Sequence, residues 1–327
     1  MTQQYLTLER VSVLVKEATL RICSYVHHTP LLATPTLSEE TSASIFLKLE
    51  NEQVTGSFKV RGAFNKIGVL ADKGVTKVYT ASTGNHGLAC ALAFKTLGVG
   101  GQVFVPVTAD DEKKKKLRAA GANLLEYGTD CAETETYARR LAEEDGVEYL
   151  SPYNDYYVLA GQGTIGAEIL QDLPDVDAIF VSVGGGGLIA GIASYVKTER
   201  PSCKIVGCSP ANSKVMHESV KVGRIIQEES KETLSDGTAG GIEEFTVTFP
   251  LCRDLVDQWV LVEEHEIAEA VFYCLKNHKK VVEGAAGVAL AAMKKVSANF
   301  KGLRVAVVIC GANISMTNLK NIITTYA

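Results

Sequence analysis

Short apolar runs alternate with amphipathic stretches along most of the chain. The apolar runs are nearly continuous and rich in valine and isoleucine, which is typical of strands buried on both faces of a parallel sheet. They lie at residues 44–50, 77–81, 102–107, 123–128, 177–183, 204–209, 259–263 and 304–310. The stretches between them look helical, and several end at glycine or soon before proline. This alternation predicts an α/β protein with right-handed crossovers.

Two irregular segments interrupt the alternation. Residues 149–164 contain proline, asparagine, aspartate and four tyrosines, and residues 234–251 are rich in turn formers without a clear period. Long irregular segments in a compact enzyme tend to line a site or to cross between domains. We therefore predict a smaller domain at residues 74–151, inserted into a larger one formed by residues 1–73 and 152–327.

The composition excludes several classes of function. The chain has 327 residues, 46% of them hydrophobic and 22% charged, as in an ordinary globular protein. Its net charge of −5 offers no general attraction to nucleic acid or anionic lipid. Four consecutive lysines, residues 113–116, directly follow acids, so we interpret them as the solvated start of a helix. No apolar run reaches membrane-spanning length, and the first residues lack the pattern of a signal peptide.

The eight cysteines show no C-x-x-C pair and no Cys/His cluster at zinc spacing. In a chain of this length, this favours reduced thiols over a disulfide framework. We expect a cytoplasmic protein that binds neither nucleic acid nor membranes and holds no metal.

Lys59 stands in the stretch NEQVTGSFKVRG, beside Phe58 and behind a turn-prone Thr-Gly-Ser. A lysine in an ordinary surface loop would look the same. The other interpretation is a lysine held in a pocket as a reactive amine. The stretch alone leaves both open.

Ligands of open α/β sheets bind beyond the carboxyl ends of strands, and three of these ends carry unusual chemistry. The first is STGNHG, residues 82–87, which leads directly into a predicted helix. Its backbone N–H groups, the hydroxyls of Ser82 and Thr83 and the amide of Asn85 suit a small carboxylate. An ordinary helix cap is the alternative, because serine, threonine and asparagine are favoured there.

The second is the glycine loop, Gly184–Gly187, between a buried strand and an apolar helix. Glycines let the backbone approach a ligand and point N–H groups at a phosphate, whereas a flexible linker is the alternative. Gly185, Gly187 and Ala190 also fit the dinucleotide fingerprint G-x-G-x-x-A. That fingerprint expects an acid after the next strand, which here ends at Ser209 with no acid nearby, so a nicotinamide cofactor is disfavoured.

The third is Cys310, which ends the last strand. It is either a small buried residue or a thiol that faces a cofactor heteroatom. Pyridoxal phosphate needs a lysine, a phosphate cradle, a partner for its ring nitrogen and a site for the substrate carboxylate. The sequence offers a candidate for each of the four.

The chain resembles the serine racemase and serine/threonine dehydratase group of pyridoxal-phosphate enzymes, whose two-domain fold is tryptophan-synthase β-like, or fold type II. The motifs that carry the resemblance span nearly the whole chain. They are TPLL (29–32), TGSFKVRGA (55–63), STGNHG (82–87), LAGQGTIGAEI (159–169), SVGGGGLIAG (182–191), SDG (235–237), RDLVD (253–257), EGAAGVALAA (283–292) and CGANIS (310–315).

The resemblance implies a role for each motif residue. Lys59 would bond to the cofactor's aldehyde, Phe58 would pack against its ring and Asn85 would hydrogen-bond its ring hydroxyl. Cys310 would lie at the pyridine nitrogen. The phosphate would be held by Gly184, Gly185, Gly186, Gly187 and Leu188. The substrate would be held by Ser82, Thr83, Gly84, Asn85, His86, Asn154 and Gly237.

Two departures from the family matter. In metal-activated racemases, acids after the strand ending at Gly207 bind a divalent cation; here Ser209 and Val215 stand at those positions, so we predict that this site is lost. The racemase loop has a second serine where this chain has Thr83, which keeps a hydroxyl. The resemblance also implies a homodimer, and the absence of an allosteric extension after the CGANIS motif implies a catabolic role.

The sequence therefore predicts a dehydratase that converts L-serine, L-threonine or both to a 2-oxo acid and ammonia. Lys59 would remove the Cα proton, because burial disfavours its charged form. A neutral thiol at the ring nitrogen stabilises a carbanion only weakly, so expulsion of the β-hydroxyl is favoured. The alternative is a racemase with Lys59 and Thr83 on opposite faces. β-Replacement and a phosphate-ligand binding protein without chemistry also stay open.

Overall fold

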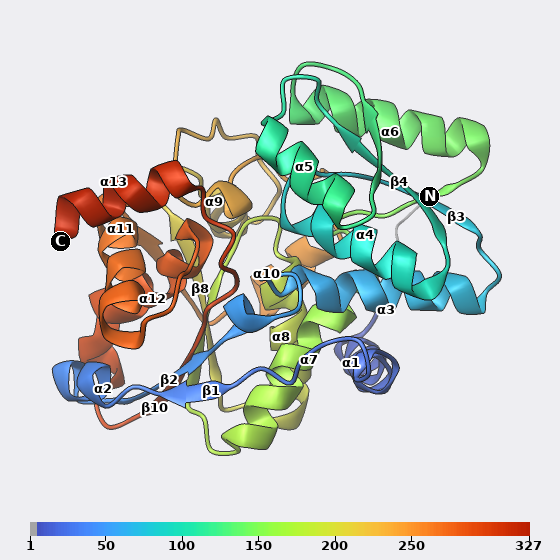
Figure 1. The fold of residues 1–327 in the computed structure, drawn as a ribbon. Coiled ribbons are helices and arrows are strands. Elements are labelled where there is room, and N and C mark those ends of the chain that lie inside the picture. Colours follow the sequence, from blue (N-terminus) through green and yellow to red (C-terminus); the bar gives the residue numbers. More distant parts are fainter. Residues whose placement is uncertain (1–4) are drawn as a thin grey trace.

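The computed structural model describes residues 5–327, and within them two sheets are each flanked by helices (Figure 1). The larger sheet has the strand order β1-β2-β10-β7-β8-β9. Its strands are β1 (Leu31–Ala33), β2 (Ser44–Lys48), β7 (Ala178–Ser182), β8 (Lys204–Pro210), β9 (Gln258–Val262) and β10 (Arg304–Val308). Only β1 runs antiparallel to its neighbour among these pairs. The predicted α/β class with mostly parallel sheets is confirmed.

The smaller sheet is parallel throughout and has the order β5-β4-β3-β6. Its strands are β3 (Lys77–Ala81), β4 (Gly100–Val105), β5 (Asn123–Glu126) and β6 (Glu148–Tyr149). Every predicted strand stretch contains a strand. β1 and β6 were not predicted, because two or three residues are too few to show a periodic pattern.

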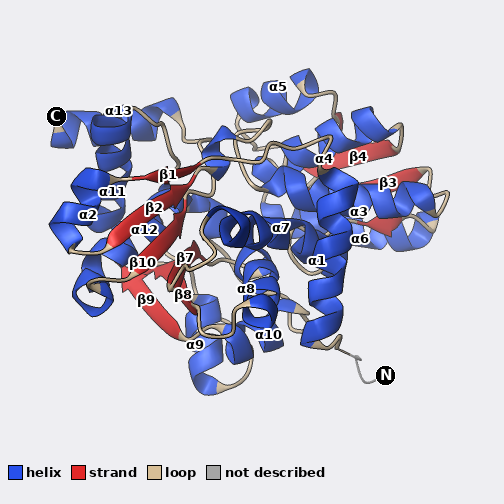
Figure 2. Ribbon diagram, turned by 90° about the horizontal axis from the view of Figure 1, so that it is seen from below, coloured by secondary structure: helices blue, strands red, loops and turns tan. Residues whose placement is uncertain are grey.

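The helices cover the two sheets and fill the space between them. Seen from below, the sheets lie apart, with α1, α3 and α7 between them (Figure 2). The helices are α1 (Leu8–Ile22), α2 (Pro35–Thr41), α3 (Lys59–Asp72), α4 (Asn85–Leu97), α5 (Asp111–Ala119), α6 (Cys131–Asp145), α7 (Tyr156–Asp172), α8 (Gly187–Glu199), α9 (Val215–Val222), α10 (Thr248–Leu255), α11 (Glu264–Tyr273), α12 (Gly284–Val296) and α13 (Met316–Tyr326). No helix within residues 5–327 combines the length and apolar character needed to cross a membrane.

Apolar residues from distant parts of the chain form two main clusters. The larger one surrounds the six-stranded sheet, in which every residue of β7 is buried, as expected of a strand covered on both faces. The other joins Val60 and Ile67 of α3 to Val78 of β3 and Ala89 of α4. Helix α3 thus shares an apolar cluster with the four-stranded sheet and α4, although it precedes residue 74. The domain division at 74–151 stays a prediction.

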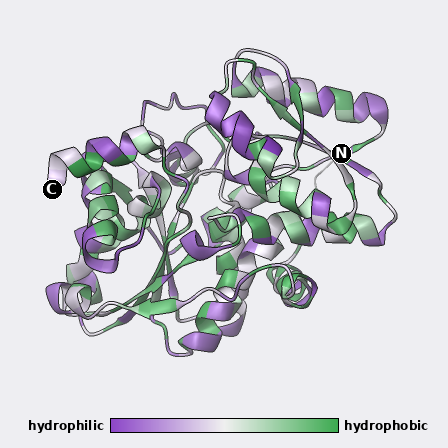
Figure 3. Ribbon diagram, viewed as in Figure 1, coloured by the Kyte–Doolittle hydropathy of each residue, from purple (hydrophilic) through white to green (hydrophobic). Residues whose placement is uncertain are grey.

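Helix α5 carries the lysine run and is mostly hydrophilic (Figure 3). Asp110 caps it by accepting hydrogen bonds from the backbone N–H groups of Glu112 and Lys113. The predicted helix is confirmed, but one lysine of the run is not solvated. Lys114 is only 6% exposed, because its amine lies 2.8 Å from Glu126 on β5.

Helix α7 packs directly against α3 and α8, and glycines make this possible. A Cβ added at Gly161 of α7 would come within 2.6 Å of the Arg61 carbonyl on α3. A Cβ at Gly191 of α8 would lie 2.0 Å from the Leu159 carbonyl on α7. Because α3 begins at Lys59 and α8 begins at the glycine loop, α7 holds these two starting points in a fixed relation.

Candidate active site

Lys59 is placed by the end of β10. Phe58 N–H donates to the Cys310 carbonyl at 3.1 Å, and Ser57 forms an isolated bridge with Gly311. The first residue of α3 is therefore fixed beside the end of a central strand of the larger sheet. Lys59 and Cys310, predicted as cofactor contacts from opposite ends of the sequence, lie in one neighbourhood.

The Lys59 amine has a carbonyl partner rather than a carboxylate. Its Nζ donates to the Pro152 carbonyl at 3.1 Å and lies 5.2 Å from the centre of the Phe58 ring. Burial lowers the pKa of Lys59 to about 8, although its electrostatic interactions with Cys90, Cys310 and Glu283 act in the opposite direction. An amine with this pKa is partly neutral near physiological pH and can accept a proton.

Asn85, the first residue of α4, is hydrogen-bonded to a buried glutamate. Its Nδ2 lies 3.0 Å from both carboxylate oxygens of Glu283, and the Asn313 N–H donates to Glu283 Oε2 at 3.0 Å. Asn313 Nδ2 also donates to Asn85 Oδ1 at 2.7 Å. Glu283 is 4% exposed, and burial raises its pKa. Sequence reasoning missed Glu283; its signal is an acid directly before the small-residue helix α12.

The predicted carboxylate loop leads from β3 into α4. Ser82 Oγ accepts from the Gly84 N–H at 3.2 Å, and Ser82, Thr83 and Gly84 are partly buried. Gly84 is the N-cap of α4 and supplies no side-chain cap, so the first N–H groups of the helix are available to an anion. A Cβ at Gly84 would meet no atom within 4 Å, so there is open space beside the loop.

The His86 side chain points into the protein rather than toward this space. Its Nε2 lies 3.0 Å from Thr80 Oγ1 and 3.3 Å from the Leu150 carbonyl, to which Thr80 Oγ1 itself donates at 2.8 Å. Because the carbonyl can only accept, Nε2 carries the proton. Burial, with the charge of Lys59 as a smaller cause, lowers the pKa of His86 to about 3. The imidazole is therefore neutral, and only the backbone of His86 is left for a substrate.

The glycine loop has no room for side chains. A Cβ at Gly184 would come within 2.8 Å of the Thr238 carbonyl, and one at Gly185 within 2.5 Å of the Tyr153 ring. Gly186 has a φ of 85°, a left-handed conformation that favours glycine. Leu188, the first residue after the glycine loop, is 6% exposed. Its side chain therefore belongs to the core, and only its backbone can face a ligand.

The residues at this site fit pyridoxal phosphate. The glycine loop is a backbone cradle at the start of α8, which suits a phosphate. Cys310 is 2% exposed, and burial raises the pKa of its thiol far above the usual value, so the sulfur stays neutral and can face a ring nitrogen. The Ser57 hydroxyl beside it is buried and has no hydrogen-bond partner among residues 5–327. An orphaned polar atom at this position is consistent with a polar ligand.

The remaining predicted contacts have other partners or lie at the margin. Asn154 Nδ2 donates to Glu243 at 2.8 Å and to the Phe245 carbonyl at 3.1 Å. Its Oδ1 accepts from the Val247 N–H at 2.9 Å. Gly237 lies near the site, because its Cβ position would be 3.5 Å from Glu283 Oε1. Contact of Asn154 and Gly237 with a substrate stays a prediction.

A buried ionic network, also missed by sequence reasoning, lies behind Lys59. Arg61 is fully buried and donates to Glu50 at 2.8 Å from both Nε and Nη2. Its two terminal nitrogens also bind Glu168 of α7, at 2.6 and 2.9 Å. Lys48 is the second cation and lies 2.6 Å from Glu168. The paired charges tie the first turn of α3 to α7 and β2.

The positions compared with the racemase metal site hold no acid. Ser209 Oγ donates to the Val183 carbonyl at 3.3 Å, and Val215 is 3% exposed. Within residues 5–327, no group of three or more His, Cys, Asp or Glu side chains is arranged to hold a metal ion.

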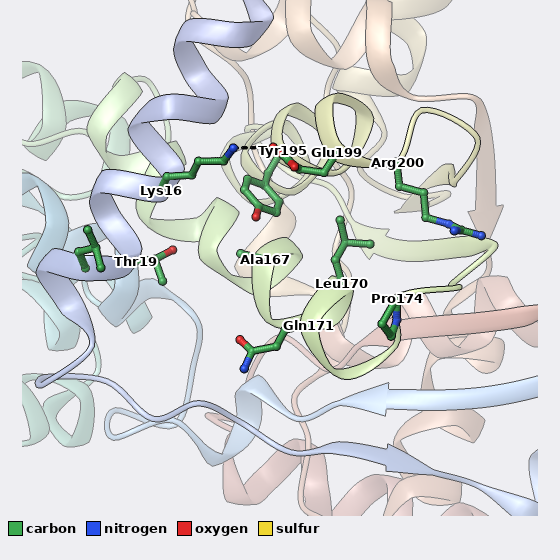
Figure 4. Close-up of a pocket in the computed structure, with 10 residues that line it drawn as sticks. Lys16, Thr19, Ala167, Leu170, Gln171, Pro174, Tyr195, Glu199 and Arg200 are labelled. Atoms are coloured by element: carbon green, nitrogen blue, oxygen red, sulfur yellow. Dashed lines mark ion pairs between the residues drawn. The ribbon is translucent and has the colours of Figure 1, made fainter.

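A surface hollow of about 620 Å³ lies elsewhere, between α1, α7 and α8 (Figure 4). It is lined by Lys16, Thr19, Leu20, Ala167, Leu170, Gln171, Pro174, Tyr195, Glu199 and Arg200. None of these is among the residues that gather around Lys59. The hollow is therefore distinct from the candidate active site.

Comparison with known proteins agrees with this geometry. Residues 22–311 match the family described as pyridoxal-phosphate dependent enzyme. The chain belongs to this family. It is 41% identical to L-threonine ammonia-lyase from Thermotoga maritima, over 94% of this chain and 77% of that protein. It is 37% identical to the catabolic L-threonine dehydratase TdcB from Staphylococcus aureus, over 99% and 96% of the two chains.

Solved structures of related enzymes have the same fold. Processed threonine deaminase isoform 2 from Solanum lycopersicum superposes with a TM-score of 0.92 at 31% identity, covering 98% of this chain and 93% of that chain. Maize serine racemase gives a TM-score of 0.88 at 31% identity, covering 96% and 97%. The predicted resemblance, the fold type and the dependence on pyridoxal phosphate are confirmed.

Proposed function

We propose that this member of the pyridoxal-phosphate dependent enzyme family is an ammonia-lyase. It converts L-threonine, L-serine or both to 2-oxobutanoate or pyruvate and ammonia. The observation that carries the proposal is the Lys59 amine, which has no carboxylate partner among residues 5–327, a pKa of about 8 and a position beside Cys310. The names of the threonine ammonia-lyase and dehydratase relatives support the choice of substrate.

Each part of the site has one task in this proposal. Bound pyridoxal phosphate supplies an electron-poor ring that stabilises the charge left when the substrate's Cα loses its proton. The glycine loop holds the phosphate, and the N–H groups at the start of α4 hold the substrate carboxylate. Lys59 Nζ would accept the Cα proton, and Asn85, held by Glu283, would hydrogen-bond the ring hydroxyl.

The neutral thiol of Cys310 favours elimination over racemisation. A carboxylate facing the ring nitrogen would keep this nitrogen protonated and favour a long-lived carbanion, whereas a buried thiol with a raised pKa carries no charge. With a neutral thiol at this position, loss of the β-hydroxyl would be favoured over return of a proton to Cα. Elimination removes water, hydrolysis adds it back, and the nitrogen leaves as ammonia.

A racemase is the second candidate, because Thr83 carries a hydroxyl in the loop that faces the substrate and maize serine racemase shares the fold. The experiment that separates the two uses purified protein with pyridoxal phosphate and L-serine or L-threonine. We expect 2-oxo acid and ammonia to form in equal amounts, with little D-isomer in the recovered amino acid. D-serine that accumulates faster than pyruvate would overturn the choice of an ammonia-lyase.

The proposal includes a homodimer and a cytoplasmic location. Light scattering of the purified holoenzyme during size-exclusion chromatography tests the oligomeric state, and a mass of one chain would exclude the dimer. Fractionation of the native cells tests the location. Neither outcome alters the assignment of Lys59.

A further inference from the structure

One carboxylate ties the irregular segment 234–247 to the rest of the molecule. Glu243 Oε1 lies 2.9 Å from Arg139 Nη2 on α6, and Glu243 Oε2 accepts from Asn154 Nδ2 at 2.8 Å. Ser151 Oγ donates to Oε1 at 3.3 Å. The side chains of Arg139 and Glu243 are 34% and 28% exposed, so water screens this pair less than it screens a fully exposed one.

The backbone of Glu243 reaches the glycine loop through Tyr153. Glu243 N–H donates to Tyr153 Oη at 3.0 Å. The Tyr153 ring in turn lies directly against the loop, since a Cβ at Gly185 would be 2.5 Å from the ring and one at Gly187 would be 3.0 Å from Tyr153 Cα. A continuous line of contacts therefore runs from α6 through Glu243 and Tyr153 to the predicted phosphate cradle.

Within residues 5–327, the residues next to this line do not make these contacts. Glu244 follows Glu243 but is exposed. Both arginines pair with a glutamate of their own helix, Arg139 with Glu135 at 2.8 Å and Arg140 with Glu144 at 2.9 Å. Arg140 is exposed, whereas Arg139 is partly buried and also reaches Glu243. The contacts of Glu243 and Arg139 thus depend on their positions and not on charge alone. The chain provides a matched control for each of the two residues.

We infer that Glu243 is a positioning residue that holds Tyr153 against the glycine loop and so retains the phosphate end of the bound cofactor. The inference rests on the proposed phosphate site and extends it to Glu243, a residue that no motif indicated. A substitution that removes the contacts of the Glu243 side chain lets Tyr153 move away from the glycine loop. Cofactor release then becomes faster, while proton transfer at Lys59, which Glu243 does not contact, changes less.

The test measures how fast purified holoenzymes lose pyridoxal phosphate, followed by the visible absorbance of bound cofactor after removal of free cofactor. We expect release to be roughly threefold faster in Glu243→Gln, which loses the Arg139 pair, and roughly tenfold faster in Glu243→Ala. Tyr153→Phe keeps the ring but removes the hydrogen-bond acceptor, and we expect it to resemble Glu243→Gln. Glu244→Gln and Arg140→Gln should release cofactor at the wild-type rate.

A double-mutant cycle tests whether the two side chains act together. Arg139→Gln should match Glu243→Gln, and the double variant should release cofactor no faster than either single variant. Additive effects would overturn the inference. kcat at saturating cofactor should fall less than the release rate rises.

The cofactor measurements separate this inference from the proposed function, and a melting experiment separates it from simple stabilisation of the fold. If the wild-type protein binds pyridoxal phosphate and Glu243→Ala releases it at the wild-type rate, the inference fails and the proposed function stands. If the wild-type protein takes up no cofactor, both fail. Melting temperatures of holoenzyme and apoenzyme test for simple stabilisation: equal loss in both forms would overturn the positioning role, whereas a larger loss in the holoenzyme supports it.

Discussion

Two lysines only eleven positions apart, Lys48 and Lys59, are enclosed by the same fold in opposite ways. Lys48 is fully buried, lies 2.6 Å from Glu168 and donates to the Thr29 carbonyl at 2.6 Å. Within the described part of the chain, Lys59 donates to the Pro152 carbonyl and to no carboxylate, and burial lowers its pKa to about 8. A buried cation is tolerated when a carboxylate compensates the loss of water. Without that partner, the lysine loses its proton more easily and becomes suited to chemistry.

The largest expected effect comes from removing the unpaired amine. Lys59→Ala should lower kcat by roughly 10⁴-fold, because it removes both the cofactor attachment and the base. The measurement is 2-oxo acid release from L-threonine and L-serine at saturating pyridoxal phosphate. The melting temperature of the cofactor-free protein should change little. Activity within roughly tenfold of wild type would contradict the assignment of Lys59.

Removing the Lys48 amine, which is paired with Glu168, should lower the free energy of unfolding while changing kcat little. Lys48→Met leaves Arg61 as the main cation between Glu50 and Glu168, so we expect the free energy of unfolding to fall by about 3 kcal/mol. Urea unfolding measures this change. Lys48→Met combined with Glu168→Gln should recover part of the loss, because the uncompensated charge is gone. A stable Lys48→Met protein with a large loss of kcat would contradict the division of roles between the two lysines.

The smallest expected effect is on the pH dependence of kcat, and it tests the difference between the two lysines directly. The Lys59 pKa is lowered from 10.5 to about 8, so its amine is neutral above that pH and kcat should rise as the pH increases through about 8. The nearby charge of Glu283 raises the pKa of Lys59, so Glu283→Gln should move this rise to lower pH by less than about one unit. Rate profiles of the two proteins measure the shift. A rise that moves to higher pH would contradict the predicted effect of Glu283.

Sequence reasoning predicted the parts of the candidate site that depend on short motifs. The STGNHG loop, the glycine loop and Cys310 follow predicted strands and could be assigned to one region, because the carboxyl ends of parallel strands meet at one edge of a sheet. Lys59 was singled out by the TGSFKVRGA motif instead. The eight predicted strands were long enough to show an apolar pattern. The strands β1 and β6 are too short to show such a pattern. They are defined by their pairing with neighbouring strands, which a local pattern does not reveal.

The missed residues are charged groups whose roles depend on distant partners. Arg61 stands inside a recognised motif, but its partners Glu50 and Glu168 are identified only by the folded arrangement. Glu283 and Glu243 likewise bind residues far away in the sequence. Charged side chains are mostly exposed, so sequence alone favours the surface for each of them. No local signal distinguishes Glu243 from its exposed neighbour Glu244.

The close packing of α7 limits how this enzyme can be altered. The contacts at Gly161 and Gly191 leave no space for even one methyl group between α7 and the helices that begin at Lys59 and at the glycine loop. The distance between Lys59 and the glycine loop is therefore set by how closely α3 and α8 pack against α7. Efforts to enlarge the pocket should leave this three-helix contact intact and redesign the flanking loops. Substitution of Gly161 would displace the helix that begins at Lys59, and substitution of Gly191 would displace the helix that begins at the glycine loop.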